Sequence, residues 1–243
     1  MTTDQLQLQM SRLKLSGMAR SWQALNETRR TCELSLAEGM EILLQAEQQQ
    51  RSNRKFERLH KNARFRYQAS VEELIFDPSR GLDKALISSL ATGEYLEKGE
   101  SILVTGSSGT GKSFLLSALG AQACAQGYSV AYFNMQKLMI KTRMARIEGT
   151  ILKFFEKLAK TGLLVLDDLG LTHLEAQQQL DLMEIIEDRH GRASIIIASQ
   201  LPVASWYDVI GPEPTVADAI LDRLVHTSYR IEFLGCESLR KKR

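Results

Sequence analysis

A glycine-rich segment at residues 106–113, GSSGTGKS, constrains this chain more than any other feature of its sequence. It follows a short apolar run, SILVT at residues 101–105, and precedes a segment with helical spacing that ends at Gly127. Glycines let a backbone fold tightly with its N–H groups pointing inward, and the next helix directs its positive end at the same place. This strand–loop–helix context predicts a phosphate-binding (Walker A) loop and argues against a chance match in a glycine-rich turn.

The loop predicts how ATP and Mg²⁺ are held. Lys112 is expected to contact the β- and γ-phosphates, and the Ser113 hydroxyl is expected to bind Mg²⁺. The expected nucleotide contacts are the loop residues and the residue after them: Gly106, Ser107, Ser108, Gly109, Thr110, Gly111, Lys112, Ser113 and Phe114.

Two further segments end in polar residues where the site should lie. The run LLVLDD at residues 163–168 predicts a Walker B motif, in which Asp167 holds Mg²⁺ and Asp168 orients or deprotonates the attacking water. Alternatively, Asp168 caps the next element. Ser199 and Gln200 end the run SIIIAS beside the phosphate site, where one of them could sense the γ-phosphate or simply close the strand.

The spacing of apolar residues predicts the fold class. Four aliphatic runs, at residues 101–105, 129–134, 163–166 and 194–199, lack alternation and are separated by helical segments. Buried parallel strands have this pattern, so we expect an α/β fold with three layers around a parallel sheet. Residues 1–75 have helical spacing throughout, with a capping box SLAE at residues 35–38 before a helix over residues 36–62. Proline and glycine near residues 77–81 suggest a hinge, which predicts a helical N-terminal domain over residues 1–75 and an ATPase domain over residues 76–243.

The composition of the chain argues against several classes of protein. The 243 residues suffice for one α/β domain with a helical appendage, and the net charge of +2 says little about partners. The three cysteines, Cys32, Cys124 and Cys236, are far apart, which argues against a disulfide framework or a zinc site and favours the cytoplasm. The N-terminus lacks the pattern of a signal peptide, and no run approaches the roughly 20 apolar residues of a membrane span.

Local charge indicates two candidate nucleic-acid surfaces. Between residues 51 and 66 there are seven basic residues and one acidic residue, among them Arg54, Lys55 and Arg58. A second basic group, Lys137, Lys141, Arg143 and Arg146, follows the second strand. Either group could neutralise DNA phosphates, although a solvated helix face has the same pattern.

With both Walker motifs placed, essentially the whole chain resembles the IstB family of transposition helper ATPases, within the DnaC-like branch of AAA+ proteins. The more specific segments are SQLPVASWYDVI, DAILDRLVH and the tail GCESLRKK. The resemblance implies that Arg223 acts as an arginine finger on a neighbouring subunit's ATP and that Arg240 is a second sensor. Alternatively, Arg223 is a surface arginine and Arg240 is part of a basic tail. It implies that the basic helix after the second strand faces the channel of an assembled ring or spiral, and that there is no separate helical lid. The sequence departs from the family's usual residues in three places: Asp168 for Glu, the pair Ser199-Gln200 for Ser/Thr-Asn, and Leu239 for Tyr.

The family's function is therefore the leading hypothesis: an ATP-dependent regulator that oligomerises on double-stranded DNA, with ATP at subunit interfaces, and recruits a transposase. ATP hydrolysis would then disassemble the complex. The alternative is a DnaC-like loader of a replicative helicase, which shares the Walker motifs and Arg223. A small-molecule P-loop kinase is disfavoured because it leaves Arg223 and the N-terminal helices unexplained.

Overall fold

The computed structural model of the protein describes residues 3–29 and 33–235, and contacts divide the chain into two compact units, Met1–Arg58 and Leu59–Arg243. The boundary between the units falls inside a long helix, α3 (Leu36–Ala63). A functional boundary between residues 75 and 76 stays a prediction. Among the described residues, no helix is long and apolar enough to span a membrane.

The N-terminal unit consists of α1 (Thr3–Arg12), α2 (Ser16–Glu27) and the first part of α3. The capping box at the start of α3 is confirmed: Glu38 Oε2 accepts from the Ser35 amide at 2.8 Å, and the Glu38 amide donates to Ser35 Oγ at 3.3 Å. A small core holds the unit together, made of Met10, Met18, Ala19, Leu25 and Leu43.

The apolar stripe expected at the start of α3 is only partly buried. Leu43 packs in the core, whereas Leu36, Met40 and Leu44 are exposed. These three residues are spaced four apart, so they form one exposed apolar face of the helix, which we call the α3 stripe.

The second unit is built on a parallel five-stranded sheet in the order β2-β3-β4-β1-β5. The strands are β1 (Ser101–Gly106), β2 (Val130–Asn134), β3 (Leu163–Leu169), β4 (Ser194–Ser199) and β5 (Ser228–Phe233). The four strands expected from the sequence are confirmed, but β5 was not predicted. Its residues are only partly buried at the edge of the sheet, so it lacks the continuous apolar run of the inner strands.

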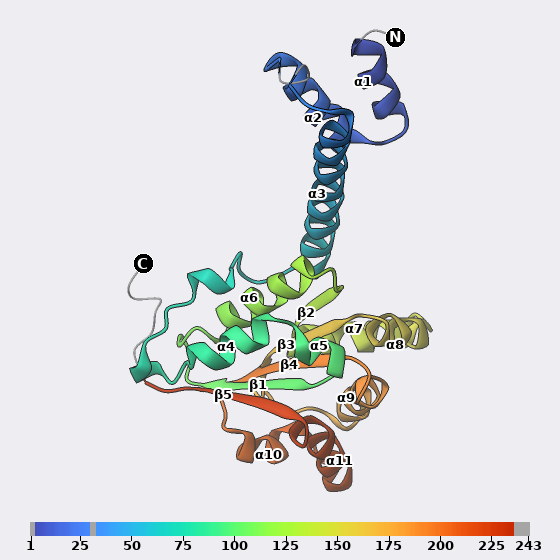
Figure 1. The fold of residues 1–243 in the computed structure, drawn as a ribbon. Helices are drawn as coiled ribbons and strands as arrows, with labels where there is room; N and C mark the ends of the chain where they lie inside the picture. The colour runs from blue at the N-terminus through green and yellow to red at the C-terminus, as the bar shows by residue number, and fades with distance from the viewer. Residues whose placement is uncertain (1–2, 30–32, 236–243) are drawn as a thin grey trace. The chain divides into compact units, whose positions relative to one another are not determined.

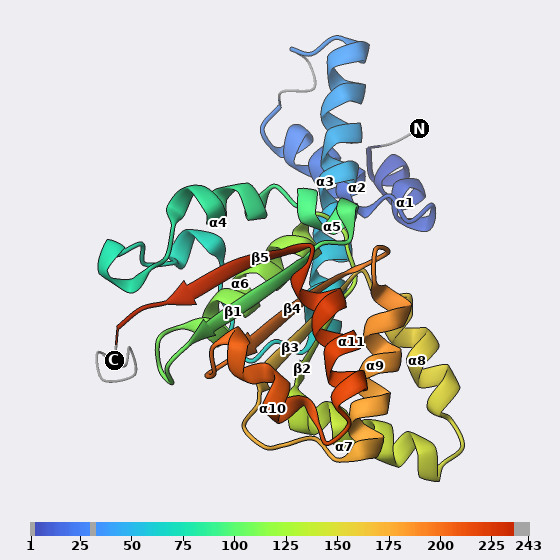
Figure 2. The same cartoon turned by 90° about the horizontal axis from the view of Figure 1, so that it is seen from below.

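Helices cover both faces of this sheet, as Figure 1 shows and Figure 2 shows from below. One face packs against α4 (Lys84–Ala91), α5 (Glu94–Lys98) and α6 (Lys112–Ala125), and the other against α7 (Met135–Ile147), α8 (Ile151–Ala159), α9 (Ala176–Arg189), α10 (Trp206–Ile210) and α11 (Pro214–Val225). Successive residues of β1 alternate between these layers: Ile102 and Val104 belong to one core and Leu103 to the other. The predicted three-layer α/β fold is thus confirmed.

Three short 3₁₀ helices complete the unit: η2 (Val71–Glu73), η3 (Pro78–Arg80) and η4 (Val203–Ser205). The segment expected to form a hinge packs against β5. The Leu234 amide donates to the Arg80 carbonyl at 2.9 Å, and a Cβ on Gly81 would lie 2.5 Å from the Glu232 carbonyl oxygen. Residues 77–81 therefore belong to the edge of the sheet, next to the phosphate loop.

Candidate nucleotide-binding site

The phosphate loop lies at the carboxyl end of β1, where the chain turns into α6. Gly106 and Gly111 have φ of 142° and 110°, a region that residues with a Cβ rarely adopt. A Cβ on Gly106 would also lie 2.7 Å from Cβ of Phe233 in β5. The sequence therefore needs glycine at these positions so that the backbone can close over an anion at the start of α6.

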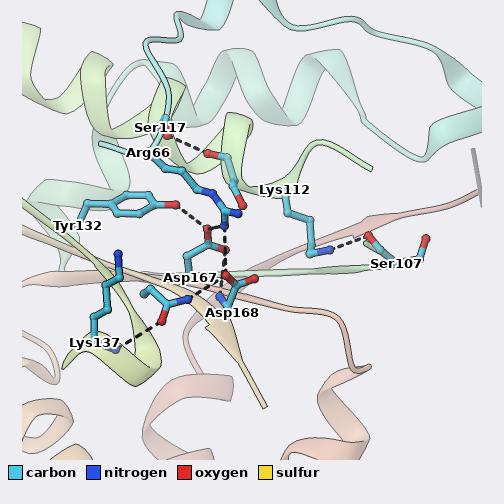
Figure 3. A network of polar contacts seen from close by, with 10 residues as sticks. Arg66, Ser107, Lys112, Ser117, Tyr132, Lys137, Asp167 and Asp168 are labelled. Atoms are coloured by element: carbon cyan, nitrogen blue, oxygen red, sulfur yellow. Dashed lines mark hydrogen bonds and ion pairs between the residues drawn. The ribbon is translucent and has the colours of Figure 1, made fainter. Parts of the chain in front are cut away.

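Lys112, the first residue of α6, folds back across the loop. Its side chain is buried, and Nζ donates to the carbonyl of Gly106 at 2.5 Å and to that of Ser107 at 2.7 Å (Figure 3). Thr110 Oγ1 donates to the Ser107 carbonyl at 2.9 Å, which tightens the same turn. The ammonium group thus lies within the loop that the sequence predicts to bind phosphates.

The two carboxylates of the predicted Walker B motif lie side by side at the end of β3. Asp168 has a left-handed backbone, with φ of 64°, and the pairing of β3 with β4 shifts register between Leu166 and Leu169. This irregularity takes both aspartates out of the ladder with β4, whereas Asp167 still pairs with Asn134 of β2. The Asp168 amide donates to Asp167 Oδ1 at 3.0 Å, and Asn134 Nδ2 at the end of β2 donates to Asp168 Oδ2 at 2.9 Å.

Tyr132 on β2 connects the two residues predicted to bind magnesium. Its hydroxyl donates to Asp167 Oδ2 at 2.5 Å and also hydrogen-bonds the side chain of Ser113. Burial, together with the negative charge of Asp167, raises the pKa of Tyr132, so the hydroxyl stays protonated and remains a donor. Neither residue type nor spacing in the sequence indicated this tyrosine.

The donor set fits a magnesium ion that arrives with a nucleotide. Mg²⁺ prefers oxygen ligands and is commonly held by one or two side chains together with phosphates and water. Ser113 and Asp167 supply a hydroxyl and a carboxylate, and Asp167 is only 1% exposed, so its charge calls for a positive partner. Within the described residues, no group of three or more His, Cys, Asp or Glu could hold a metal by itself.

Arg66 is that positive partner in the structure, and the sequence did not predict it as part of the site. Its Nη1 lies 3.3 Å from Asp167 Oδ2 and 3.1 Å from Asp168 Oδ2 (Figure 3). In the sequence, Arg66 is one of the seven basic residues between residues 51 and 66 that form a candidate DNA surface. That assignment is wrong for this residue, because its side chain points at the Walker B carboxylates.

A cavity of about 330 Å³ opens next to the loop. Residues 108–114 of the predicted nucleotide site line it, together with Asp168 and Gln200. Its other walls come from segments that the sequence did not assign to the site: Arg66, Tyr67, Glu73, Leu74, Ile75, Arg80, Leu82 and Phe233. The volume lies within the range of small-molecule sites, and the mixture of apolar walls and a polar loop suits a nucleotide.

Ser199 and Gln200 lie differently. Ser199 is fully buried, its hydroxyl donates to the Leu169 carbonyl at 2.7 Å, and it accepts from the Leu201 amide at 3.1 Å. The first of these contacts ties β4 to β3, whereas Gln200 faces the cavity. Of the two, only Gln200 is placed to meet a nucleotide.

Arg223 lies near the amino end of β1, whereas the phosphate loop follows the carboxyl end of that strand. It is in the last turn of α11, pairs with Glu187 of α9, and donates to the Ala219 carbonyl at 2.9 Å. It borders a recess with Gly99 and Ser101 at the start of β1, whereas the loop follows the end of that strand. The side chain therefore does not reach the loop of its own chain. Arg240 lies outside the described residues.

The candidate DNA residues are exposed in both units. Arg54, Lys55 and Arg58 lie on α3, and Lys137, Lys141 and Arg143 lie on α7. Lys141 Nζ lies 5.2 Å from the ring centroid of Phe133. Arg146, in contrast, forms an ion pair with the buried Asp181, which gives it a structural role.

Comparison with known proteins identifies the family of the chain. A family model described as IstB-like ATP binding protein matches residues 8–243. The chain belongs to this IstB-like family. An insertion-sequence ATP-binding protein of Sinorhizobium fredii is 41% identical over 232 residues, which cover 96% of this chain and 94% of the relative. The IS21 ATP-binding protein of Pseudomonas aeruginosa is 29% identical over 98% of this chain and 89% of its own length.

Solved structures share the α/β fold of this IstB-like protein. AMPPCP-bound DnaA from Aquifex aeolicus matches with a TM-score of 0.60 and 22% identity, over 74% of this chain and 54% of DnaA. The DnaC helicase loader matches with a TM-score of 0.52 and 23% identity, over 61% of this chain and 86% of DnaC. At these identities the likeness establishes the fold, and the family match identifies an ATP-binding protein of insertion sequences.

Proposed function

We propose that this chain is an ATP-hydrolysing regulator of transposition that assembles on double-stranded DNA, recruits the transposase of its insertion sequence, and is released by hydrolysis. The observation that carries the proposal is the convergence of the phosphate loop with Asp167 and Asp168 in an insertion-sequence protein. Binding alone needs the loop, whereas a second carboxylate beside the first supports hydrolysis.

The residues at the site have distinct roles in this proposal. Lys112 exchanges its carbonyl partners for the β- and γ-phosphates, while Ser113 and Asp167 hold Mg²⁺. When bound, Mg²⁺ neutralises phosphate charge and supports attack on the γ-phosphate. Asp168, held by Asn134, orients the attacking water and accepts its proton. Gln200 follows β4 directly and faces the cavity, where it would sense the γ-phosphate.

The position of Arg223 supports an oligomer. A guanidinium at the γ-phosphate stabilises the transition state, but this one lies at the opposite end of β1 from the loop of its own chain. It can therefore serve only a neighbouring subunit, which would couple hydrolysis to assembly. In a chain without a neighbouring subunit, the ion pair with Glu187 would hold the Arg223 side chain in place.

Exposed groups support the proposed partners. The basic side chains of α7 and α3 suit phosphates of the DNA backbone, so we expect binding that weakens steeply with salt. The α3 stripe is an exposed apolar face on the N-terminal unit, which suits an apolar face of a protein such as the transposase.

Hydrolysis is tested by comparing Lys112→Ala, Asp168→Asn and Asp218→Asn in the full chain. Lys112→Ala should lower ATP affinity by at least about tenfold because it removes charged contacts to phosphate. Asp168→Asn should keep ATP binding and lower turnover by about 100-fold or more. Asp218 is exposed on α11, so the same charge change there should alter neither quantity. Wild-type turnover in Asp168→Asn would exclude the catalytic role.

Assembly and partners are tested with the same proteins. If Arg223 acts on a neighbour, mixing Arg223→Ala with Asp168→Asn should restore part of the ATPase activity that each lacks. Lys137→Glu with Lys141→Glu should weaken duplex DNA binding and leave nucleotide binding unchanged. A pull-down should capture the transposase encoded beside the chain, and capture of a replicative helicase instead would favour the loader alternative.

A further inference from the structure

Arg66 pairs with Oδ2 of Asp167 and with Oδ2 of Asp168, the two Walker B carboxylates. Its guanidinium is the only cation that forms an ion pair with either carboxylate among the described residues. Asp167 and Asp168 have side chains that are 1% and 18% exposed, so two negative charges lie close together with little water around them. Such a pair is costly unless a positive group compensates it.

The neighbours of Arg66 in the chain hold it in this position. Phe65 packs directly over Gly120 of α6, where a Cβ would lie 2.4 Å from the phenyl ring, and its ring lies 6.2 Å from that of Tyr132. On the other side, the ring of Tyr67 lies 6.3 Å from that of Phe114, the third residue of α6. Both anchors belong to the helix that starts at the phosphate loop. The arginine is thus aimed at the carboxylates by the packing of the segment that carries it.

The position of Arg66 also brings it to the nucleotide, because its side chain lines the cavity and is 40% exposed. A guanidinium stays charged at any physiological pH. It can therefore neutralise the Walker B carboxylates when no metal is present, and it can withdraw into the open cavity when a metal arrives.

We propose that Arg66 is a built-in counter-ion of Asp167 and Asp168, which Mg²⁺ arriving with ATP must displace. The inference rests on the proposed binding of Mg²⁺ and ATP at this site. Arg66 then sets the Mg²⁺ concentration at which nucleotide binds tightly.

This role predicts two opposite changes in Arg66→Gln. Without Mg²⁺, the variant exposes two uncompensated carboxylates to the triphosphate, so its affinity for free nucleotide should fall. With Mg²⁺, the metal no longer competes with a cation, so less of it should be needed. Since the arginine is partly exposed, we expect the half-saturating Mg²⁺ concentration to fall about three- to tenfold. Arg66→Lys keeps the charge and should stay near the wild type.

The test is a Mg²⁺ titration of the full chain with a fluorescent, non-hydrolysable ATP analogue, with EDTA as the metal-free arm. Lys61→Gln is the matched control, because Lys61 is an exposed cation near the end of α3 and the substitution removes the same charge. A lower Mg²⁺ midpoint in Arg66→Gln, with weaker binding in EDTA, supports the proposal.

Three other results would contradict either this proposal or the proposed function on which it rests. Weaker binding of Arg66→Gln in both arms would make Arg66 a permanent phosphate ligand and overturn the proposal. A midpoint equal to those of the wild type and Lys61→Gln would also overturn it, whatever the thermal stability of the variant. If the wild type itself binds no analogue with Mg²⁺, the proposed function fails instead.

Discussion

Glu47 offers a way to loosen the N-terminal unit without touching the nucleotide site. It is 6% exposed on α3, and its Oε2 accepts from the Gly17 amide at 2.7 Å and the Met18 amide at 3.3 Å, while Arg51 Nε donates to Oε1 at 2.7 Å. Both amides belong to the first turn of α2, which lacks a side-chain cap of its own. Glu47 therefore does the work of a capping residue from another helix.

The cost of Glu47→Ala follows from these contacts. A hydrogen bond to a charged group contributes about 1.5–3 kcal/mol, and the short bond from Gly17 is of this kind. Arg51 is largely exposed, so its ion pair adds at most about 1 kcal/mol. The variant also removes the cost of burying a carboxylate, which reduces the net effect to about 2 kcal/mol.

Hydrogen–deuterium exchange of the full chain measures this effect locally. The amides of α2 should exchange about 30-fold faster in Glu47→Ala, and those of α6 should be unchanged. Glu41→Ala is the control, because Glu41 is exposed on the same helix. Burial opposes the charge of Glu47, but Arg51 and the two amides outweigh it and lower its pKa, so the stabilisation is present above about pH 4.5 and is lost as the pH falls through that lowered pKa. Wild-type exchange in α2 would refute the capping role.

Two further variants test the site. Tyr132→Phe removes the hydroxyl that donates to the buried Asp167, so it should lower the free energy of unfolding by about 1–3 kcal/mol. Urea denaturation without nucleotide measures this change. An unchanged denaturation midpoint would show that Arg66 alone compensates Asp167. Gly106→Ala places a Cβ 2.7 Å from that of Phe233 on a left-handed backbone, so ATP binding measured by calorimetry should be lost or strongly reduced; retained affinity would mean that β5 can move aside.

The parts of the structure that the sequence predicts are those with local causes. The phosphate loop depends on glycines at fixed spacing, and its neighbouring strand and helix are visible within about 25 residues. The inner strands are continuous apolar runs because helices cover both faces of the sheet. This pattern does not identify β5, because an edge strand has one open side and needs no continuous apolar run.

The walls of the cavity could not be predicted in the same way. Tyr67, Leu74 and Leu82 precede the loop by 39, 32 and 24 residues in the sequence, and nothing in their spacing shows that they fold over it. Ser199 and Gln200 show the same limit at shorter range. Both are polar residues at a strand end, but only the path of the chain decides that the hydroxyl is used between strands and the amide faces the cavity.

Arg66 shows why charge class alone misleads. In the sequence it ends a run of basic residues, and a run of this kind usually indicates a solvated or DNA-binding face. Its actual partners lie 101 and 102 residues further along the chain. Its charge suggested that Arg66 binds DNA. The direction of its side chain, however, is determined by the two aromatic residues beside it, because they pack on α6. In a basic segment interrupted by aromatic residues, the cations flanked by rings that pack on the ATPase unit are therefore the ones to test at the active site. Those on the regular helix before it, such as Arg54 and Arg58, are the ones to test with DNA.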